Sequence, residues 1–169
     1  MPVRRAISIL VLALGAAGCG DDRVALALDC QNPENVRRQV EACTGLIAVD
    51  PKHRKAYDLR CQAYNHLEQY EKALADCNMA VKLTPSTASP YNNRGVTYEM
   101  RGDFDAALKD YDKAVELNPT FAAAYANRGD VYAKKGDRTR AVTEYRQALA
   151  IEPGNEVALS GLKKLGAAR

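Results

Sequence analysis

The sequence is poor in the residues that most enzymes use for chemistry. Its 169 residues include no tryptophan and only two histidines, His53 and His66. A catalytic site needs a nucleophile with a base within hydrogen-bond reach, and neither histidine lies in such a pattern. No glycine-rich phosphate loop is present, and no cysteine or histidine pair has the CxxC or HxxxH spacing of metal ligands. We therefore expect no enzyme, no cofactor and no metal site.

The chain also lacks a long hydrophobic run and an excess of one charge. Its apolar stretch AISILVLALGAAG, residues 6–18, is shorter than the about 20 residues that a transmembrane helix needs. The formal charge of +3 includes Arg4 and Arg5, so the rest of the chain carries 22 basic and 21 acidic residues. This balance does not provide the strongly basic face that is typical of nucleic-acid binding, and we expect no nucleic-acid partner.

The apolar stretch is typical of an export signal. A positive start, an apolar core and small residues at the end predict a secretory signal peptide at residues 1–18. The alternative is a retained N-terminal anchor. The end of the stretch, LGAAGCG, resembles the lipobox of bacterial lipoproteins, in which an acylated cysteine becomes the first residue of the mature chain. That residue would be Cys19, although Ala16 stands where leucine is usual, so ordinary signal cleavage stays open.

Lipidation at Cys19 implies a place in the cell envelope. Several acyl chains on one cysteine anchor a protein stably, whereas a single chain binds membranes only marginally. Gly20, and not aspartate, follows the cysteine. By resemblance to enterobacterial lipoproteins, this implies the outer membrane. A soluble periplasmic or secreted protein is the alternative.

From residue 54 onward the sequence repeats itself every 34 residues. The stretch YNNRGVTYEMRGDFDAALKDY at residues 91–111 returns as YANRGDVYAKKGDRTRAVTEY at residues 125–145. Residues of one kind recur at this interval: Tyr57, Tyr91 and Tyr125; Ala73, Ala107 and Ala141; Ala80, Ala114 and Ala148; and Pro51, Pro85, Pro119 and Pro153. This period, with small and aromatic residues in these columns, resembles the tetratricopeptide repeat, a helix–turn–helix unit.

The resemblance implies an all-α solenoid of stacked helical hairpins. Its expected parts are a degenerate half-repeat cap with a short first helix at residues 19–53, repeats at 54–87, 88–121 and 122–154, and a C-terminal capping helix at 155–169. Gly95 would let the two helices of its repeat approach closely opposite Ala107, as Gly129 would opposite Ala141. Each proline ends a second helix because it cannot continue the hydrogen-bond ladder.

Opposite charges recur at the same interval. One column holds Arg60, Arg94 and Arg128, and another holds Asp76, Asp110 and Glu144. Because the first column falls in first helices and the second in second helices, they predict a ladder of ion pairs between helices. We interpret this ladder as structural and not as a ligand site.

Four cysteines remain when Cys19 is set aside: Cys30, Cys43, Cys61 and Cys77. Export would let disulfides persist, and four cysteines allow three pairings. Cys61 stands in the glycine column and Cys77 in the tyrosine column of one antiparallel helix pair, which makes their bridge geometrically plausible. Cys30 with Cys43 would then staple the N-terminal cap. The alternatives are a bridge from Cys43 to Cys61 and four buried thiols.

In the tetratricopeptide family the first helices line a concave surface, where partner peptides usually lie. The resemblance places these residues on it: Lys55, Asp58, Gln62 and Asn65; Ser89, Asn92, Asn93, Val96 and Glu99; Ala123, Ala126, Asn127 and Asp130. The family's clamp for a terminal carboxylate uses lysines, asparagines and an arginine, and only Asn93 matches it. Asp58 and Ala123 replace lysines and Asn127 replaces the arginine, so recognition of chaperone tails is not expected.

The sequence predicts an exported, lipid-anchored interaction module or scaffold of a bacterial cell envelope. Asparagine side chains both donate and accept hydrogen bonds, so the Asn-rich centre can bind an extended peptide of another protein without demanding one sequence. The cationic corner at Lys52, Arg54 and Lys55 lies beside it. Solvated helix faces are the alternative for these residues. The alternative functions are a self-associating structural protein and an accessory subunit of a cell-wall enzyme complex.

Overall fold

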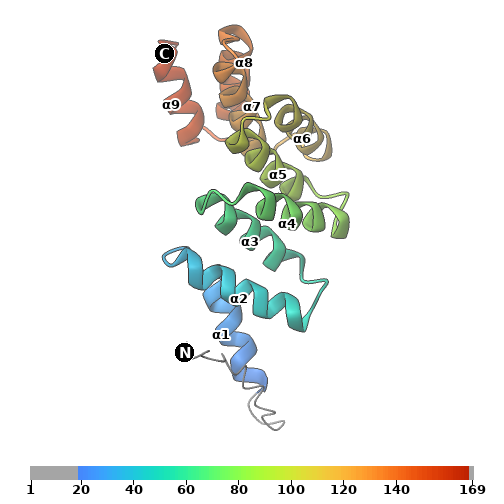
Figure 1. Ribbon diagram of the computed structural model, residues 1–169. Coiled ribbons are helices and arrows are strands. Elements are labelled where there is room, and N and C mark those ends of the chain that lie inside the picture. The colour runs from blue at the N-terminus through green and yellow to red at the C-terminus, as the bar shows by residue number, and fades with distance from the viewer. Residues whose placement is uncertain (1–18, 168–169) are drawn as a thin grey trace, which may run out of the picture.

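The computed structural model describes residues 19–167, and over that range it consists of helices without a strand (Figure 1). The helices are α1 (Cys19–Gln31), α2 (Val36–Val49), α3 (Arg54–His66), α4 (Tyr70–Leu83), α5 (Ala88–Arg101), α6 (Phe104–Leu117), α7 (Ala122–Lys134), α8 (Arg138–Ile151) and α9 (Glu156–Lys164). Successive hairpins stack into an elongated solenoid with α1 at one end and α9 at the other (Figure 1). The predicted all-α solenoid is confirmed. The predicted signal peptide, residues 1–18, and the side chain of Cys19 lie outside the described residues.

The helix boundaries reproduce the 34-residue period. The second helices α4, α6 and α8 begin 34 residues apart and each spans 14 residues. Gly102 ends α5 with φ 93°, and Gly136 follows α7 with φ 81°, a left-handed conformation that suits glycine because it has no side chain. Glu68 takes the same place in the first repeat with φ 56°. The turn geometry therefore persists where the glycine does not.

The two helices of a repeat touch most closely where a tyrosine ring covers a glycine. A Cβ atom added to Gly95 would lie 2.6 Å from Cε1 of Tyr111, and one added to Gly129 would lie 2.7 Å from Cε1 of Tyr145. Both rings are fully buried. The sequence analysis placed Ala107 opposite Gly95, but the structure places the ring of Tyr111 there. The glycine is needed because the ring fills the space of any side chain.

The first repeat replaces this contact by a disulfide bond. Cys61 and Cys77 take the columns of Gly95 and Tyr111, and their Cα atoms are 5.6 Å apart across the bridge. A second bridge joins Cys30 of α1 to Cys43 of α2, with a Cα separation of 4.8 Å. All four cysteines are buried. The bridges are the two that the helix positions favoured, and the pairing of Cys43 with Cys61 does not occur.

The missing tyrosine explains an unsatisfied buried group in the first repeat. In the second repeat the hydroxyl of Tyr111 donates to Oε2 of Glu99 at 2.6 Å. The corresponding residues in the first repeat are Cys77, which offers no hydroxyl, and Asn65. Asn65 is buried, its Nδ2 donates to Oγ1 of Thr97 at 2.9 Å, and its Oδ1 has no hydrogen-bond partner. The first repeat therefore keeps an acceptor, Asn65, at the position of Glu99, whereas the tyrosine that would donate to it is replaced by the disulfide-bonded Cys77.

The predicted ladder of ion pairs is confirmed, and it extends further than the sequence indicated. Arg94 donates from Nε and Nη2 to both carboxylate oxygens of Asp110 at 2.7 Å, and from Nη1 back to Asn78 of the preceding repeat at 2.9 Å. The other two arginines act in the same way: Arg60 with Asp76 and Thr44, and Arg128 with Glu144 and Asp112. Each arginine thus joins three helices from two repeats.

The N-terminal hairpin departs from the repeats in its first helix. The sequence predicted only a short helix there, but α1 has 13 residues, as many as α3. Its last residue, Gln31, accepts a hydrogen bond from Nζ of Lys55, close to the start of α3, at 3.0 Å. Neighbouring first helices of the repeats instead meet at matching levels, as Asn92 of α5 does with Asn127 of α7. α2 keeps the register of a second helix, so the hairpin is complete but set differently from a repeat.

Removing the disulfide of the first repeat tests whether the bridge and the glycine–tyrosine contact of the later repeats are equivalent. We expect Cys61→Ser with Cys77→Ser to lower the free energy of unfolding by about 3 kcal/mol, because the bridge closes a short loop. Cys61→Gly with Cys77→Tyr should recover part of this loss, since it restores the contact of the later repeats and supplies a hydroxyl to Asn65. Urea unfolding followed by circular dichroism measures both variants. If the serine variant and the glycine–tyrosine variant were equally stable, the glycine–tyrosine contact would not replace the bridge.

The glycine under the tyrosine ring gives a second prediction. Gly129→Ala should lower the free energy of unfolding by about 1–3 kcal/mol, because the ring of Tyr145 has to shift in a packed core. Gly154→Ala is the matched control, since no atom lies within 4 Å of its added Cβ. Thermal unfolding of the two variants measures the difference. Equal melting temperatures would show that the close contact does not stabilise the repeat.

Candidate functional site

The first helices α3, α5 and α7 lie side by side and form one surface, which we call the inner face. Hydrogen bonds connect them in sequence: Asn65 of α3 with Thr97 of α5, and Asn92 of α5 with Asn127 of α7. α9 continues this row, because the glycine Gly161 packs against Tyr145 as Gly129 of α7 does. The inner face therefore extends over four helices of the described chain.

The structure buries part of the predicted peptide site. Asp58, Asn65 and Asn92 are only 6%, 5% and 7% exposed, so they form a floor between helices and not a lining. Ala126 is buried as well. The remaining predicted positions reach the surface: Lys55, Gln62, Ser89, Asn93, Val96, Glu99, Ala123, Asn127 and Asp130. A partner segment on this face would contact this second set.

The buried Asp58 lies close to the half-exposed Asn93. The buried carboxylate pairs with Arg54 of its own helix, while its Oδ1 has no hydrogen-bond partner. Burial raises the pKa of Asp58, and the Arg54 guanidinium and the nearby Asn93 carboxamide oppose this rise. Asn93 of α5 thus lies beside the buried carboxylate of α3.

One repeat later a half-exposed asparagine is hydrogen-bonded to a buried one. Nδ2 of Asn127 donates to Oδ1 of Asn92 at 3.0 Å. Asn92 follows Asp58 by 34 residues, and Asn127 follows Asn93 by the same interval. Asn127 is thus held by a buried acceptor, and the half-exposed Asn93 occupies the equivalent position beside Asp58.

Tyrosine hydroxyls from the second helices reach carboxylates of the inner face. Besides its bond from Tyr111, Glu99 accepts from Nζ of Lys134 at 2.7 Å through its other oxygen. The hydroxyl of Tyr145 donates to Oδ1 of Asp130 at 2.5 Å. Burial, then the charge of Glu99, raises the pKa of Tyr111, and burial followed by the bond to Asp130 raises the pKa of Tyr145. Both phenols therefore remain donors at neutral pH.

A pocket lies at each end of the inner face. The first, of about 120 Å³, lies among α1, α2 and α3 and is lined by Ala27, Cys30, Gln31, Leu46, His53, Lys55 and Leu59. The second, of about 350 Å³, lies between α7 and α9 and is lined by Asp130, Glu156, Val157, Ser160, Gly161 and Lys164. The sequence analysis did not include α9 in the site. The 34-residue interval could have found it, since Val157, Ser160 and Lys164 follow Ala123, Ala126 and Asp130 by one period.

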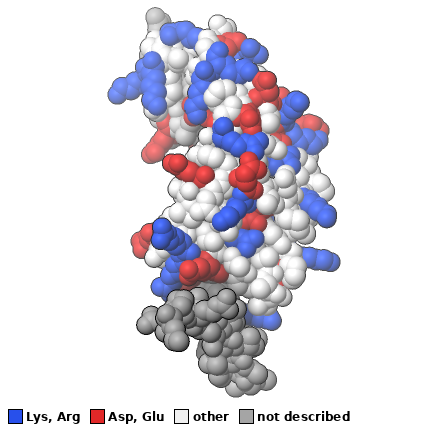
Figure 2. Space-filling model, viewed as in Figure 1, with Lys and Arg blue, Asp and Glu red and all other residues white. Residues whose placement is uncertain are grey.

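Charges of both signs alternate along the solenoid. Figure 2 shows basic and acidic side chains interleaved over the visible face, without one large patch of either sign. This follows from the repeated ion pairs, which place an acidic residue beside each of several arginines and lysines. The pattern supports specific contacts and not a broad electrostatic attraction.

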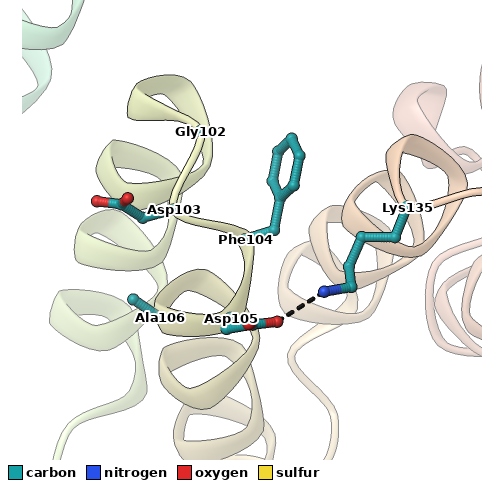
Figure 3. A pocket seen from close by; sticks show the side chains of 6 residues that line it. All are labelled: Gly102, Asp103, Phe104, Asp105, Ala106 and Lys135. Carbon is teal, nitrogen blue, oxygen red and sulfur yellow. Dashed lines mark hydrogen bonds and ion pairs between the residues drawn. The ribbon is translucent and has the colours of Figure 1, made fainter.

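A further pocket, at the turn between α5 and α6, is part of the repeat architecture. It is lined by Gly102, Asp103, Phe104, Asp105, Ala106 and Lys135. In Figure 3 the Lys135 side chain from the end of α7 reaches Asp105, to which it donates at 2.6 Å, while Phe104 points away from this bond. One repeat earlier Arg101 makes the equivalent pair with Glu71 at 2.7 Å. The recurring pair holds adjacent repeats together and leaves no free charge for a ligand.

Neither histidine stands in a catalytic arrangement. Nδ1 of His53 accepts from the backbone N–H of Ala56 at 3.1 Å and caps the start of α3, and His66 is exposed at its end. Over the described residues no group of three His, Cys, Asp or Glu side chains could hold a metal ion. In the same part of the chain, no helix has the length and hydrophobicity of a membrane span. That the protein is not an enzyme stays a prediction.

Comparison with known proteins places the chain by sequence and by fold. Residues 88–121 and 122–155 match family profiles described as tetratricopeptide repeat, whereas no curated protein matches the chain in sequence. A thermophilic TPR protein of Thermus thermophilus has a similar structure, with a TM-score of 0.75 at 20% identity over 87% of this chain and 83% of that one.

Two smaller domains are similar as well. The Arabidopsis OM64 TPR domain has a TM-score of 0.63 at 26% identity, over 67% of this chain and 93% of that one. The second TPR domain of human RPAP3, in complex with the HSP70 peptide SGPTIEEVD, has a TM-score of 0.58 at 25% identity, over 63% of this chain and 89% of that one. With two matched repeats, the 34-residue columns and these structural neighbours, the chain belongs to the tetratricopeptide repeat family.

Proposed function

We propose that this protein is a peptide-binding interaction module of a bacterial cell envelope, exported and anchored through an acylated Cys19. The similar RPAP3 domain is in complex with a peptide, which supports peptide binding as the use of this fold. The partner would be a segment of another envelope protein that lies across the inner face.

The observation that carries the proposal is the half-exposed amide of Asn127, with Asn93 at the equivalent position one repeat earlier. Nδ2 of Asn127 donates to the buried Asn92, and its carbonyl oxygen is left for a partner. Such oxygens are acceptors for the backbone N–H groups of a peptide. Because its bond to Asn92 already holds Asn127 in place, little entropy of that side chain is lost on binding, which favours affinity.

The chemistry of the inner face also limits the kind of peptide. A terminal carboxylate needs several cations around it, but Asp58 places a buried negative charge where the family's clamp has a lysine, and Ala123 offers no charge. Like charges brought together without compensation weaken binding. The inner face therefore suits an internal segment of a partner and not an acidic C-terminus.

Disulfide bonds support export. Two buried bridges within the described residues fit an oxidising compartment, where such bonds persist. α1 begins at Cys19, so a lipid on that residue would tether the folded solenoid without an intervening linker. The outer membrane is the proposed location.

Binding on the inner face is tested by a triple substitution. Lys55→Ala, Asn93→Ala and Asn127→Ala together remove three exposed polar groups of the inner face without substituting a residue of the buried floor. We expect capture of envelope partners after in-cell cross-linking to fall at least about tenfold, because several peptide hydrogen bonds of about 0.5–1.5 kcal/mol each are lost. The control carries Lys82→Ala, Lys109→Ala and Glu116→Ala on exposed positions of second helices. Equal capture by both variants would place binding elsewhere.

Anchoring is tested at Cys19. Cys19→Ser should move the protein from the membrane fraction to a soluble envelope fraction, because its acyl chains are the proposed anchor. Mass spectrometry of the wild-type N-terminus should show an acylated cysteine as the first residue. An unmodified mature chain in the soluble fraction would instead support ordinary signal cleavage.

A further inference from the structure

The charged groups in the middle of the inner face are compensated by neighbours. Asp58 forms an ion pair with Arg54, and Glu99 forms one with Lys134. Asn93 of α5 and Asn127 of α7, which also reach the surface of this face, are neutral. The centre of the inner face therefore offers hydrogen bonds but no free charge.

The pocket at the N-terminal end carries a cation without an acidic partner. Within the described chain Lys55 bonds to the neutral carboxamide of Gln31, at 3.0 Å, and forms no ion pair. The same pocket has an apolar wall that includes Leu46 and Leu59. A carboxylate of a partner that enters here meets an ammonium group whose charge is not already neutralised.

The pocket at the C-terminal end carries the opposite charge. It brings together the carboxylates of Asp130 and Glu156 with the single ammonium of Lys164, a net charge of one negative. Among the described residues neither carboxylate forms an ion pair, since Asp130 is bonded to the hydroxyl of Tyr145. A basic side chain of a partner is the group that this pocket fits.

We propose that the inner face selects a partner segment with opposite charges at its two ends, an acidic residue at Lys55 and a basic residue at Asp130 and Glu156. Adjacent packed helices lie about 8–10 Å apart, so the path from α3 to the cleft between α7 and α9 is roughly 20–25 Å. An extended chain rises about 3.3 Å per residue, so about six to eight residues separate the two charges. This inference rests on the proposed function.

The test is selection of a displayed random dodecapeptide library on the immobilised mature protein and on two charge-reversed variants. The wild type should enrich peptides with one acidic and one basic residue six to eight positions apart. Lys55→Glu makes both ends negative and should enrich doubly basic peptides. Glu156→Lys makes both ends positive and should enrich doubly acidic ones. Circular dichroism of each variant checks that it is folded, and Lys109→Glu on α6 is the control for a charge reversal away from the inner face.

Binding of synthetic peptides quantifies the preference. By fluorescence anisotropy the wild type should bind a selected peptide at least about tenfold more tightly than its doubly acidic or doubly basic version, because one attractive contact becomes a repulsive one. The difference should shrink as salt is added, since exposed charges are screened. These results, together with the two shifts in selection, would support the inference.

Three other outcomes separate this inference from the function on which it rests. If all variants enrich peptides of the same charge pattern, and the triple alanine variant loses them, the inner face binds peptides but the charge selection is wrong. If the triple alanine variant retains those peptides, binding on the inner face is wrong as well. If the wild type enriches no peptide, both the inference and the proposed peptide binding are overturned.

Discussion

Each hairpin of the solenoid depends on one close approach between its two helices. In the second and third repeats a tyrosine ring lies directly on a glycine, and in the first repeat two cysteines bridge the same positions. The two solutions fill the same gap in opposite ways, one with a large ring against no side chain and one with two small side chains joined covalently. Helix spacing is thereby kept while the chemistry of the contact changes. The inner face depends on this spacing, because the rings of Tyr111 and Tyr145 carry the hydroxyls that position Glu99 and Asp130.

Neighbouring hairpins are coupled by the arginine ladder. Each arginine reaches the second helix of its own repeat and that of the repeat before it, residues 16 positions after and before it in the sequence. Such contacts extend only to the adjacent repeat, which is the usual basis of stability in solenoids. The disulfides reinforce the N-terminal end. There Arg60 bonds the hydroxyl of Thr44, where the later arginines bond an amide or a carboxylate, and α1 does not follow the repeat register.

The fold could be predicted from the sequence because the 34-residue interval gives the positions of the helices, turns and ion pairs of all repeats together. The same interval predicted the pairing of Cys61 with Cys77 through the columns they occupy. It did not reveal that Asn92 is buried, because its column, although buried throughout, holds the polar residues Asp58 and Asn92 before Ala126. Nor did it predict the full length of α1, whose contact with Lys55 has no equivalent in the repeats. Within the inner face, the columns identified candidate positions, but only the three-dimensional contacts separate compensated charges from free ones.

The ladder also determines where the solenoid can grow. The column of acceptors Thr44, Asn78 and Asp112 continues after 34 residues as Arg146, and the column of arginines continues as Leu162. Duplication of residues 88–121 within the chain would give every arginine an acceptor in the repeat before it. A repeat of the same kind added after residue 155 would instead bring its arginine against Arg146. This family member can therefore lengthen by duplication in its interior without losing a ladder contact, whereas a repeat of the same kind added at its C-terminal end would meet a like charge.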